Sequence, residues 1–265
     1  MEFFTLPVDN FDLIILLISC FLGSLVTTSV GAGGGLFVIA GMSMVLPATT
    51  LLSIHALTQA GAGLMRSFIF RKSVIFKVFF LFILGSLIGY SLSIHFLVTL
   101  PEYVMKFILG LGIIILNFLP KFEIKKVSNY MILIVGTLTG FLTMFIGAMG
   151  PIVILFFSAF ISNRQLIVGT LAWCISFQNL GKAIIFGNLG FDYSSWIVLI
   201  VILIIVSYLG TIIGKKLLEK SNDVLFKKVL KIVILILGSK LIFDATNIYF
   251  SLWGLLWKYS FCYLY

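Results

Sequence analysis

Apolar segments long enough to cross a lipid bilayer follow one another along nearly the whole chain, and only short polar stretches separate them. Because a spanning helix needs about 20 residues, the 265 residues have room for roughly ten such segments and for no sizeable soluble domain. The segments are continuously apolar rather than alternating, which indicates helices and not the strands of a membrane β-barrel. The sequence therefore predicts an all-α polytopic membrane protein with about 8–10 membrane segments.

The composition excludes the soluble alternatives. Hydrophobic residues make up 61% of the chain and charged residues 10%, and the mean hydropathy is +1.22. A soluble domain is about 45–50% apolar and roughly 25% charged, whereas a disordered chain is poor in apolar residues. Cys20, Cys174 and Cys262 are scattered without the spacing of a disulfide framework or a zinc site, so we expect no metal and no cofactor.

The apolar segments form two sets of five on either side of a basic loop. The first set is expected at 13–30, 36–46, 49–65, 74–94 and 103–119, and the second at 130–146, 152–161, 166–186, 193–213 and 229–243. In each set the second segment is too short to span, and a glycine-rich break precedes it, at 31–35 and 147–151. We therefore divide the chain into a first membrane repeat (1–120), a basic cytoplasmic loop (121–128), a second membrane repeat (129–244) and an aromatic tail (245–265). The tail predicts an interfacial helix, with a further membrane crossing as the alternative.

Charge predicts how the two repeats are oriented. The formal net charge is +9, and in a membrane protein such an excess is typical of cytoplasmic loops rather than of a nucleic-acid partner. The basic residues cluster around 66–77, 121–126 and 215–231. The acidic residues on stretches that this assignment places outside are Glu2, Asp9, Asp12, Glu102, Asp192 and Asp244. The first repeat then begins outside and the second begins inside, so we expect two inverted-topology repeats.

The glycine breaks are the most informative motif. Consecutive glycines destabilise a helix by about 1 kcal/mol each relative to alanine, and a broken helix in a membrane must be enclosed by protein or line a cavity. A helix that starts after such a break exposes backbone N–H groups and carries partial positive charge, which suits an anion. We therefore place substrate-binding backbone at Gly33, Gly34, Gly35 and Gly150. The alternative is that these small residues serve close helix packing.

Polar side chains inside the apolar segments are the second group of candidates, because burying them is costly. Lys182 lies three residues from Asn179 and four from Gln178, so the three side chains share one helix face. A lysine beside two amides that act as hydrogen-bond donors suits the binding of an oxyanion. Snorkelling of Lys182 toward the nearby end of its segment is the alternative. In the comparable segment of the first repeat, Thr58 and Gln59 are candidate donors.

The remaining ionisable residues have other interpretations. His55 is a candidate proton or anion site, with a buried neutral histidine as the alternative. Arg66, Arg71 and Lys72 are interpreted as topology determinants. No Asp or Glu falls inside any predicted segment, and hydrolase motifs are missing from the sequence, so we expect no enzyme and no catalytic residues.

One pattern of motifs covers nearly the whole chain in two copies. Its residues are 31–35 with Pro47, then 55–66 leading to Arg71 and Lys72, and in the second repeat 147–151, 168–170, Asn179, Lys182 and 187–190. This pattern resembles the TauE/SafE family of sulfite and sulfonate exporters. The resemblance implies a bacterial inner-membrane transporter for sulfur-containing organic or inorganic anions, often acting in export. Met149 and His55 stand where the family usually has glycine, and Met149 is expected to narrow the pocket.

We therefore expect a secondary transporter for a small anion, a sulfur-containing oxyanion or an organosulfonate, which works by alternating access. One alternative is an anion-selective channel built on the same glycine breaks. Another is a membrane enzyme or assembly factor that uses Lys182 or His55. The expected partners are the small anion and the lipid bilayer, with no nucleic acid, and a homo-oligomer is left open.

Overall fold

The computed structural model describes residues 6–30, 33–97, 101–118, 127–218, 232 and 234–251, and every regular element in this part of the chain is a helix. The helices are α1 (Asn10–Val30), α2 (Gly34–Met42), α3 (Ala48–Ile69), α4 (Phe76–Leu97), α5 (Glu102–Asn117), α6 (Asn129–Ile146), α7 (Gly150–Ser158), α8 (Arg164–Asn188), the short 3-10 helix η1 (Ser194–Trp196) and α9 (Ile197–Leu218). A last helix covers Ile234–Ser251. Each predicted apolar segment overlaps at least one of these helices, which confirms the all-α prediction for the described residues.

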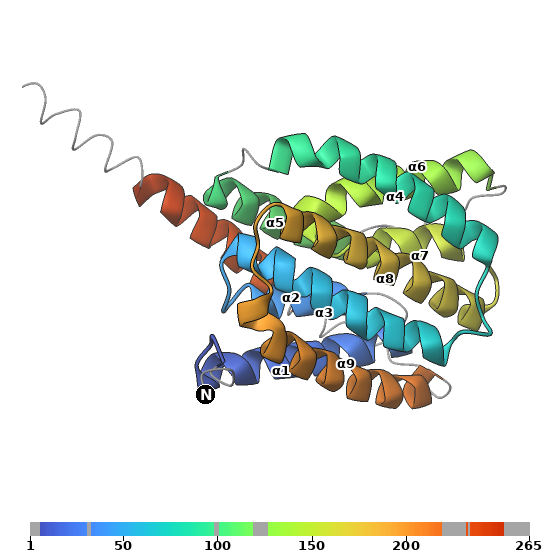
Figure 1. Ribbon diagram of the computed structural model, residues 1–265, viewed down its shortest axis with the longest axis horizontal. Helices are drawn as coiled ribbons and strands as arrows, with labels where there is room; N and C mark the ends of the chain where they lie inside the picture. Colours follow the sequence, from blue (N-terminus) through green and yellow to red (C-terminus); the bar gives the residue numbers. More distant parts are fainter. Residues whose placement is uncertain are drawn as a thin grey trace, which may run out of the picture.

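The helices that carry the polar candidates lie in the middle of the bundle. Among the described residues, five helices are long and apolar enough to cross a membrane: α1, α4, α6, η1 together with α9, and Ile234–Ser251. The helices α3 and α8 are not among them, because their polar residues lower their hydropathy. They pack against each other, with α4 beside α8 and α9 beside α3 (Figure 1), and Gly63 of α3 lies against Ser176 of α8. Their polar faces are turned into the bundle, whereas Phe68 of α3 and Ile184 of α8 are exposed.

Both glycine breaks connect a long helix to a short one, as the sequence predicts. Gly33, directly before α2, has φ 91°, and Gly147, directly after α6, has φ 85°. This left-handed conformation is accessible to glycine at little cost and strained for other residues. The short helix α2 doubles back along α1 so closely that a Cβ at Gly34 would lie 1.8 Å from the carbonyl oxygen of Gly23. Gly34 is therefore a packing glycine.

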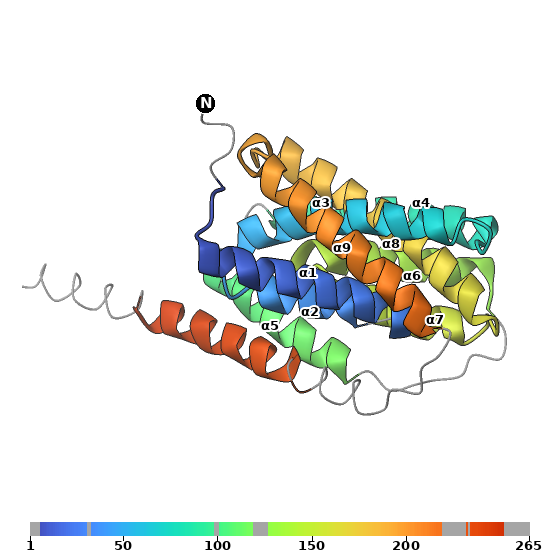
Figure 2. The ribbon, with the colours of Figure 1, turned by 90° about the horizontal axis from the view of Figure 1, so that it is seen from below.

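Two pairs of helices join the first half of the chain to the second. α1 packs against α9, and α4 packs against α6 (Figures 1 and 2). In each pair, glycines four residues apart bring the backbones into contact, with Gly85 and Gly89 of α4 against α6, and Gly210 and Gly214 of α9 against α1. Small residues that allow close backbone approach are a common basis of helix association in membranes.

Charged residues gather at opposite ends of the bundle. Arg71, Lys72 and Lys215 line one cavity of about 310 Å³, so the link between α3 and α4 lies beside the end of α9. α1 and α9 run in the same direction, which places their beginnings, with Asp12 and Asp192, at the other end. Hydrogen bonds from two neighbouring serines hold the pKa of the Asp192 carboxyl at about 2, so that this end keeps its negative charge. Which end faces the cytoplasm stays a prediction.

Some predicted features lie outside the described residues. They include most of the central basic loop (119–126), the basic stretch 219–231 and residues 252–265 of the tail. The last helix, Ile234–Ser251, continues past Asp244 without a break, so the first part of the tail extends this helix. The division of the chain into two repeats, a loop and a tail stays a prediction.

Replacing Gly136 by alanine should destabilise the protein, because the added Cβ would lie 2.3 Å from the carbonyl oxygen of Phe82 in α4. Overpacking of this kind costs about 1–3 kcal/mol, and we expect it to lower the Tm of the purified protein in detergent. Gly187→Ala is the matched control, because its Cβ would make only an ordinary contact, at 3.5 Å from Tyr193. An unchanged Tm for Gly136→Ala would contradict the close packing of α4 on α6.

Candidate functional site

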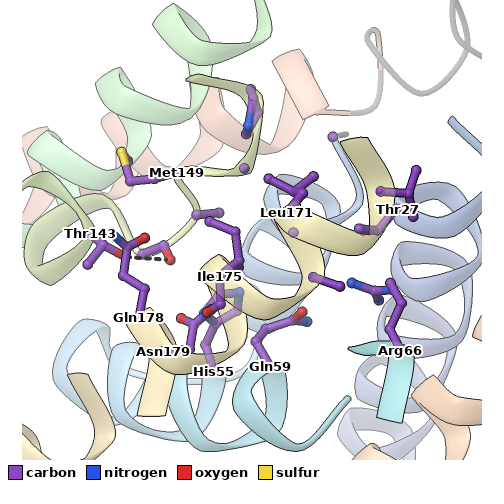
Figure 3. Close-up of a pocket in the computed structure, with 18 residues that line it drawn as sticks. Thr27, His55, Gln59, Arg66, Thr143, Met149, Leu171, Ile175, Gln178 and Asn179 are labelled. Carbon is purple, nitrogen blue, oxygen red and sulfur yellow. Dashed lines mark hydrogen bonds between the residues drawn. The ribbon is translucent and has the colours of Figure 1, made fainter. Parts of the chain in front are cut away.

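A small cavity lies between the two glycine breaks and the polar faces of α3 and α8 (Figure 3). Its volume is about 40 Å³, which is room for roughly three water-sized groups. The sequence candidates that line it are Gly33, Gly35, His55, Gln59, Gly150, Gln178 and Asn179. The structure therefore brings together, from both halves of the chain, most of the residues that we proposed for substrate binding.

Buried polar atoms without a hydrogen-bond partner in the described part of the chain concentrate on α3 and α8. On these two helices near the cavity they are both ring nitrogens of His55, Thr58 Oγ1, Gln59 Nε2, Arg66 Nη2, Asn179 Oδ1 and Lys182 Nζ. Folded proteins leave few buried polar groups unsatisfied, and each exception requires an explanation. Such a concentration around one cavity indicates a site for a polar ligand rather than ordinary helix packing.

Two basic side chains are buried without a buried acid among the described residues. Arg66 is 5% exposed and Lys182 is 0% exposed. The ion pairs found in the described ranges, Lys106–Glu102 and Lys240–Asp244, lie elsewhere at partly exposed positions. A buried charge without a partner costs on the order of several kcal/mol. The electrostatics of this interior therefore favour the entry of an anion.

Arg66 is the site residue that the sequence interpretation missed. We interpreted it as a topology determinant in a basic loop, but α3 extends to Ile69 and Arg66 lies buried within it. Its Nε donates to Thr28 Oγ1 at 3.1 Å, and its side chain lines the cavity (Figure 3). A signal was present in the sequence, because Arg66 follows Gln59 by seven residues, which is about two helical turns and the same helix face.

Lys182 lies behind the cavity wall rather than on it. Its side chain is fully enclosed, so the alternative that it snorkels to the membrane interface is wrong. It is not among the lining residues, but it lies within electrostatic reach of His55. Counted from the starts of their helices at Ala48 and Arg164, Arg66 and Lys182 occupy the same position. The two buried basic residues thus lie equally far from the starts of α3 and α8.

The amides of Gln178 and Asn179 are oriented by contacts that the sequence does not reveal. Both N–H groups of Gln178 are occupied, because its Nε2 donates to Ser86 Oγ and to Thr139 Oγ1, each at 3.1 Å. The Nδ2 of Asn179 donates to the carbonyl of Ile175 at 2.9 Å, and its Oδ1 has no partner among the described residues. Gln178 therefore cannot serve as the donor that we expected, and Asn179 presents a free acceptor.

The backbone candidates contribute unequally. Gly34 and Thr58 are buried but do not line the cavity, and Gly34 faces α1 instead. The first turn of α2 supplies N–H groups through Gly35. α7 offers fewer, because Pro151 has no N–H and the N–H of Ile152 donates to the carbonyl of Met149 at 3.1 Å. α2 is therefore the stronger of the two anion-binding helix ends.

Comparison with protein-family models matches the model described as sulfite exporter TauE/SafE over residues 15–241, from within α1 to within the last described helix. The chain belongs to this family. Searches of curated proteins and of solved structures found no match. TauE/SafE is a family of membrane transporters and not of enzymes, and the match confirms the resemblance that the glycine breaks indicated.

The two residues that we expected to depart from the TauE/SafE pattern both lie on the cavity wall. Met149 and His55 line the cavity, and each is 1% exposed. Both side chains take up space that glycine would leave open, which contributes to the small volume. The family pattern thus coincides with the place where the structure gathers its unpaired polar atoms.

Lys182→Met should stabilise the ligand-free protein and weaken its response to anions. The substitution keeps most of the side-chain volume and removes a buried amino group without a hydrogen-bond partner among the described residues, so we expect the free energy of unfolding to rise by about 1–3 kcal/mol. Thermal unfolding in gluconate buffer, with and without sulfite, measures both effects. Lys240→Met is the control, because the Lys240 side chain is 49% exposed and pairs with Asp244. A lower Tm for Lys182→Met would mean that its ammonium group is already satisfied.

Proposed function

We propose that the protein is a secondary transporter that moves a small sulfur-containing anion, a sulfur oxyanion or a small organosulfonate, by alternating access. The observation that carries this proposal is the pair of buried cations, Arg66 and Lys182, without a buried acid among the described residues. Membership of the sulfite exporter TauE/SafE family supports the sulfur-oxyanion class. The cavity volume of about 40 Å³ favours an anion the size of sulfite or a one-carbon sulfonate over a longer chain.

The cavity wall supplies donors suited to such an anion. The guanidinium of Arg66 presents N–H groups in a plane, which matches two oxygens of one oxyanion. Its bond to Thr28 holds the Nε side and leaves Nη2 for the substrate. Gln59 Nε2 and the N–H groups at the start of α2 complete the donor set. These groups are fixed before binding, so the anion exchanges its water shell for protein donors without large rearrangement of the wall.

We base alternating access on the proposed inverted repeats. The first repeat comprises α1 to α5, and the second comprises α6 to α9 and the last described helix, in the same order. Under this correspondence the contact of α1 with α9 is equivalent to that of α6 with α4, and both contacts are present. Arg66 and Lys182 are equivalent as well. In this structure Arg66 lines the cavity and Lys182 does not. Rocking of the repeats would exchange their surroundings, so that Lys182 lines the cavity in the oppositely facing state.

We propose export as the direction of transport. The basic end of the bundle, with Arg71, Lys72 and Lys215, then faces the cytoplasm in keeping with the positive-inside rule. The membrane potential supplies a driving force in that direction, because a negative interior expels anions with about 2.3 kcal/mol per charge per 100 mV.

Sulfite efflux from proteoliposomes tests the proposal. Arg66→Gln and Lys182→Met should each reduce the initial rate by at least about tenfold, because each removes a charge-assisted contact from one of the two states. Arg71→Gln and Lys240→Met are the matched controls at exposed positions and should leave the rate near that of the wild type.

The same assay separates a transporter from a channel. A transporter should show efflux that saturates with sulfite and that is accelerated by sulfite on the opposite side. Unsaturable flux with conductance in a planar bilayer would establish a channel instead. Small and equal effects of all four substitutions would overturn the proposed site.

Gly150→Ala should lower transport without lowering Tm. A Cβ at Gly150 would have no heavy atom within 4 Å, so the methyl group would extend into the cavity that Gly150 lines. Displacing the anion from its donors by such a group should reduce the efflux rate by about tenfold. Gly187→Ala again serves as the control. A fall in Tm that parallels the loss of transport would place Gly150 in helix packing rather than in the site.

A further inference from the structure

One acceptor on the cavity wall cannot be satisfied by the oxygens of an anion. Asn179 lines the cavity beside His55 and Gln59 (Figure 3), and it is only 3% exposed. Its Oδ1 is buried and has no hydrogen-bond partner among the described residues. A carbonyl oxygen can accept only from an N–H or O–H group. An unpaired buried acceptor is costly, and an anionic oxygen placed against it adds repulsion.

The orientation of this amide follows from its other contact. Asn179 Nδ2 donates to the carbonyl of Ile175 at 2.9 Å, and the reversed orientation would set two carbonyl oxygens against each other. Lys182, one turn further along α8, does not donate to Asn179, because its Nζ also lacks a partner within the described residues. No described protein group donates to Asn179 Oδ1, so a ligand bound in the cavity is in a position to supply this donor.

Gln178 adds a second amide of the same kind. The hydroxyls that accept from its Nε2, those of Ser86 and Thr139, give their own protons to the carbonyls of Phe82 and Val135. These hydroxyls can therefore act only as acceptors toward Gln178, which fixes its Nε2 on their side. With both N–H groups occupied, the side chain has only its Oε1 to offer to the cavity that it lines.

We propose that the substrate carries a hydrogen-bond donor directly on its anionic head group. Sulfur oxyanions of this class include hydrogen sulfite and sulfamate, whereas the sulfite dianion and methanesulfonate have no such donor. The anionic oxygens of the substrate contact Arg66 and Gln59, and Asn179 Oδ1 accepts a hydrogen bond from the N–H or O–H group of the substrate. This substrate class rests on the transport function proposed above. A site built around a buried polar group discriminates strongly against an analogue that leaves this group unpaired.

Sulfamate and methanesulfonate provide the test, because both are monoanions of closely similar size and only sulfamate carries N–H groups. In proteoliposomes at subsaturating concentration, the wild-type protein should transport sulfamate about tenfold faster than methanesulfonate. Sulfite serves as the reference anion in the same preparation. Equal rates for sulfamate and methanesulfonate would overturn this inference and leave the transport function intact. Absence of flux for all three anions would instead overturn the proposed function.

Asn179→Leu identifies the residue responsible. The substitution keeps the shape of the side chain and removes the acceptor, so the preference for sulfamate over methanesulfonate should disappear. Asn188→Leu, at an exposed position of the same helix, should keep the wild-type preference. Asn179→Leu could instead slow the transport of sulfamate and methanesulfonate by the same factor and preserve the preference. That result would show that Asn179 acts only on helix structure, and it would overturn the assigned role. The wild-type comparison decides the substrate class even where Asn179→Leu fails to fold.

Discussion

The irregular backbone at the two glycine breaks is the constraint on which the rest of this structure depends. Lipid offers no hydrogen bonds to free N–H and C=O groups, so both breaks must be enclosed by protein. The more polar α3 and α8 lie side by side between the apolar α4 and α9 (Figure 1), and the breaks meet the polar faces of α3 and α8 at one cavity. A region that must be protected from lipid is also one where polar side chains can be kept, and the site occupies that region.

The buried charges illustrate the conflict between stability and function. Arg66 and Lys182 would be expensive to bury in a protein selected only for stability, and the described residues provide no buried carboxylate to offset them. An acidic partner would stabilise the empty protein, but it would also compete with an anionic substrate for the same donors. Leaving the cations unpaired keeps the interior attractive to an anion at the expense of the stability of the empty state.

The sequence predicted the features that depend on local pattern. The described helices overlap the predicted apolar segments, and both breaks are found where the glycine pattern places them. The partners of Gln178 could not be predicted, because they come from α4 and α6, which are distant in the sequence. Arg66 was misjudged because basic residues near segment ends usually determine topology, and its burial depends on how far α3 extends. Hydropathy locates the helices, but it does not tell which polar atoms find partners across them.

The two halves of the site are not chemically alike, and this has a consequence for transport. Arg66 in α3 and Lys182 in α8 lie the same number of residues from the starts of their helices, and in the proposed repeats they correspond to each other. A guanidinium can bind two oxygens of one oxyanion in fixed geometry, whereas an ammonium group acts as a compact point charge. With the proposed exchange of surroundings, the two states would therefore hold the same anion with different affinity. This difference in affinity cannot set the direction of net transport, because the substrate gradient and the membrane potential determine that direction. It determines from which side of the membrane the transport rate saturates at the lower substrate concentration.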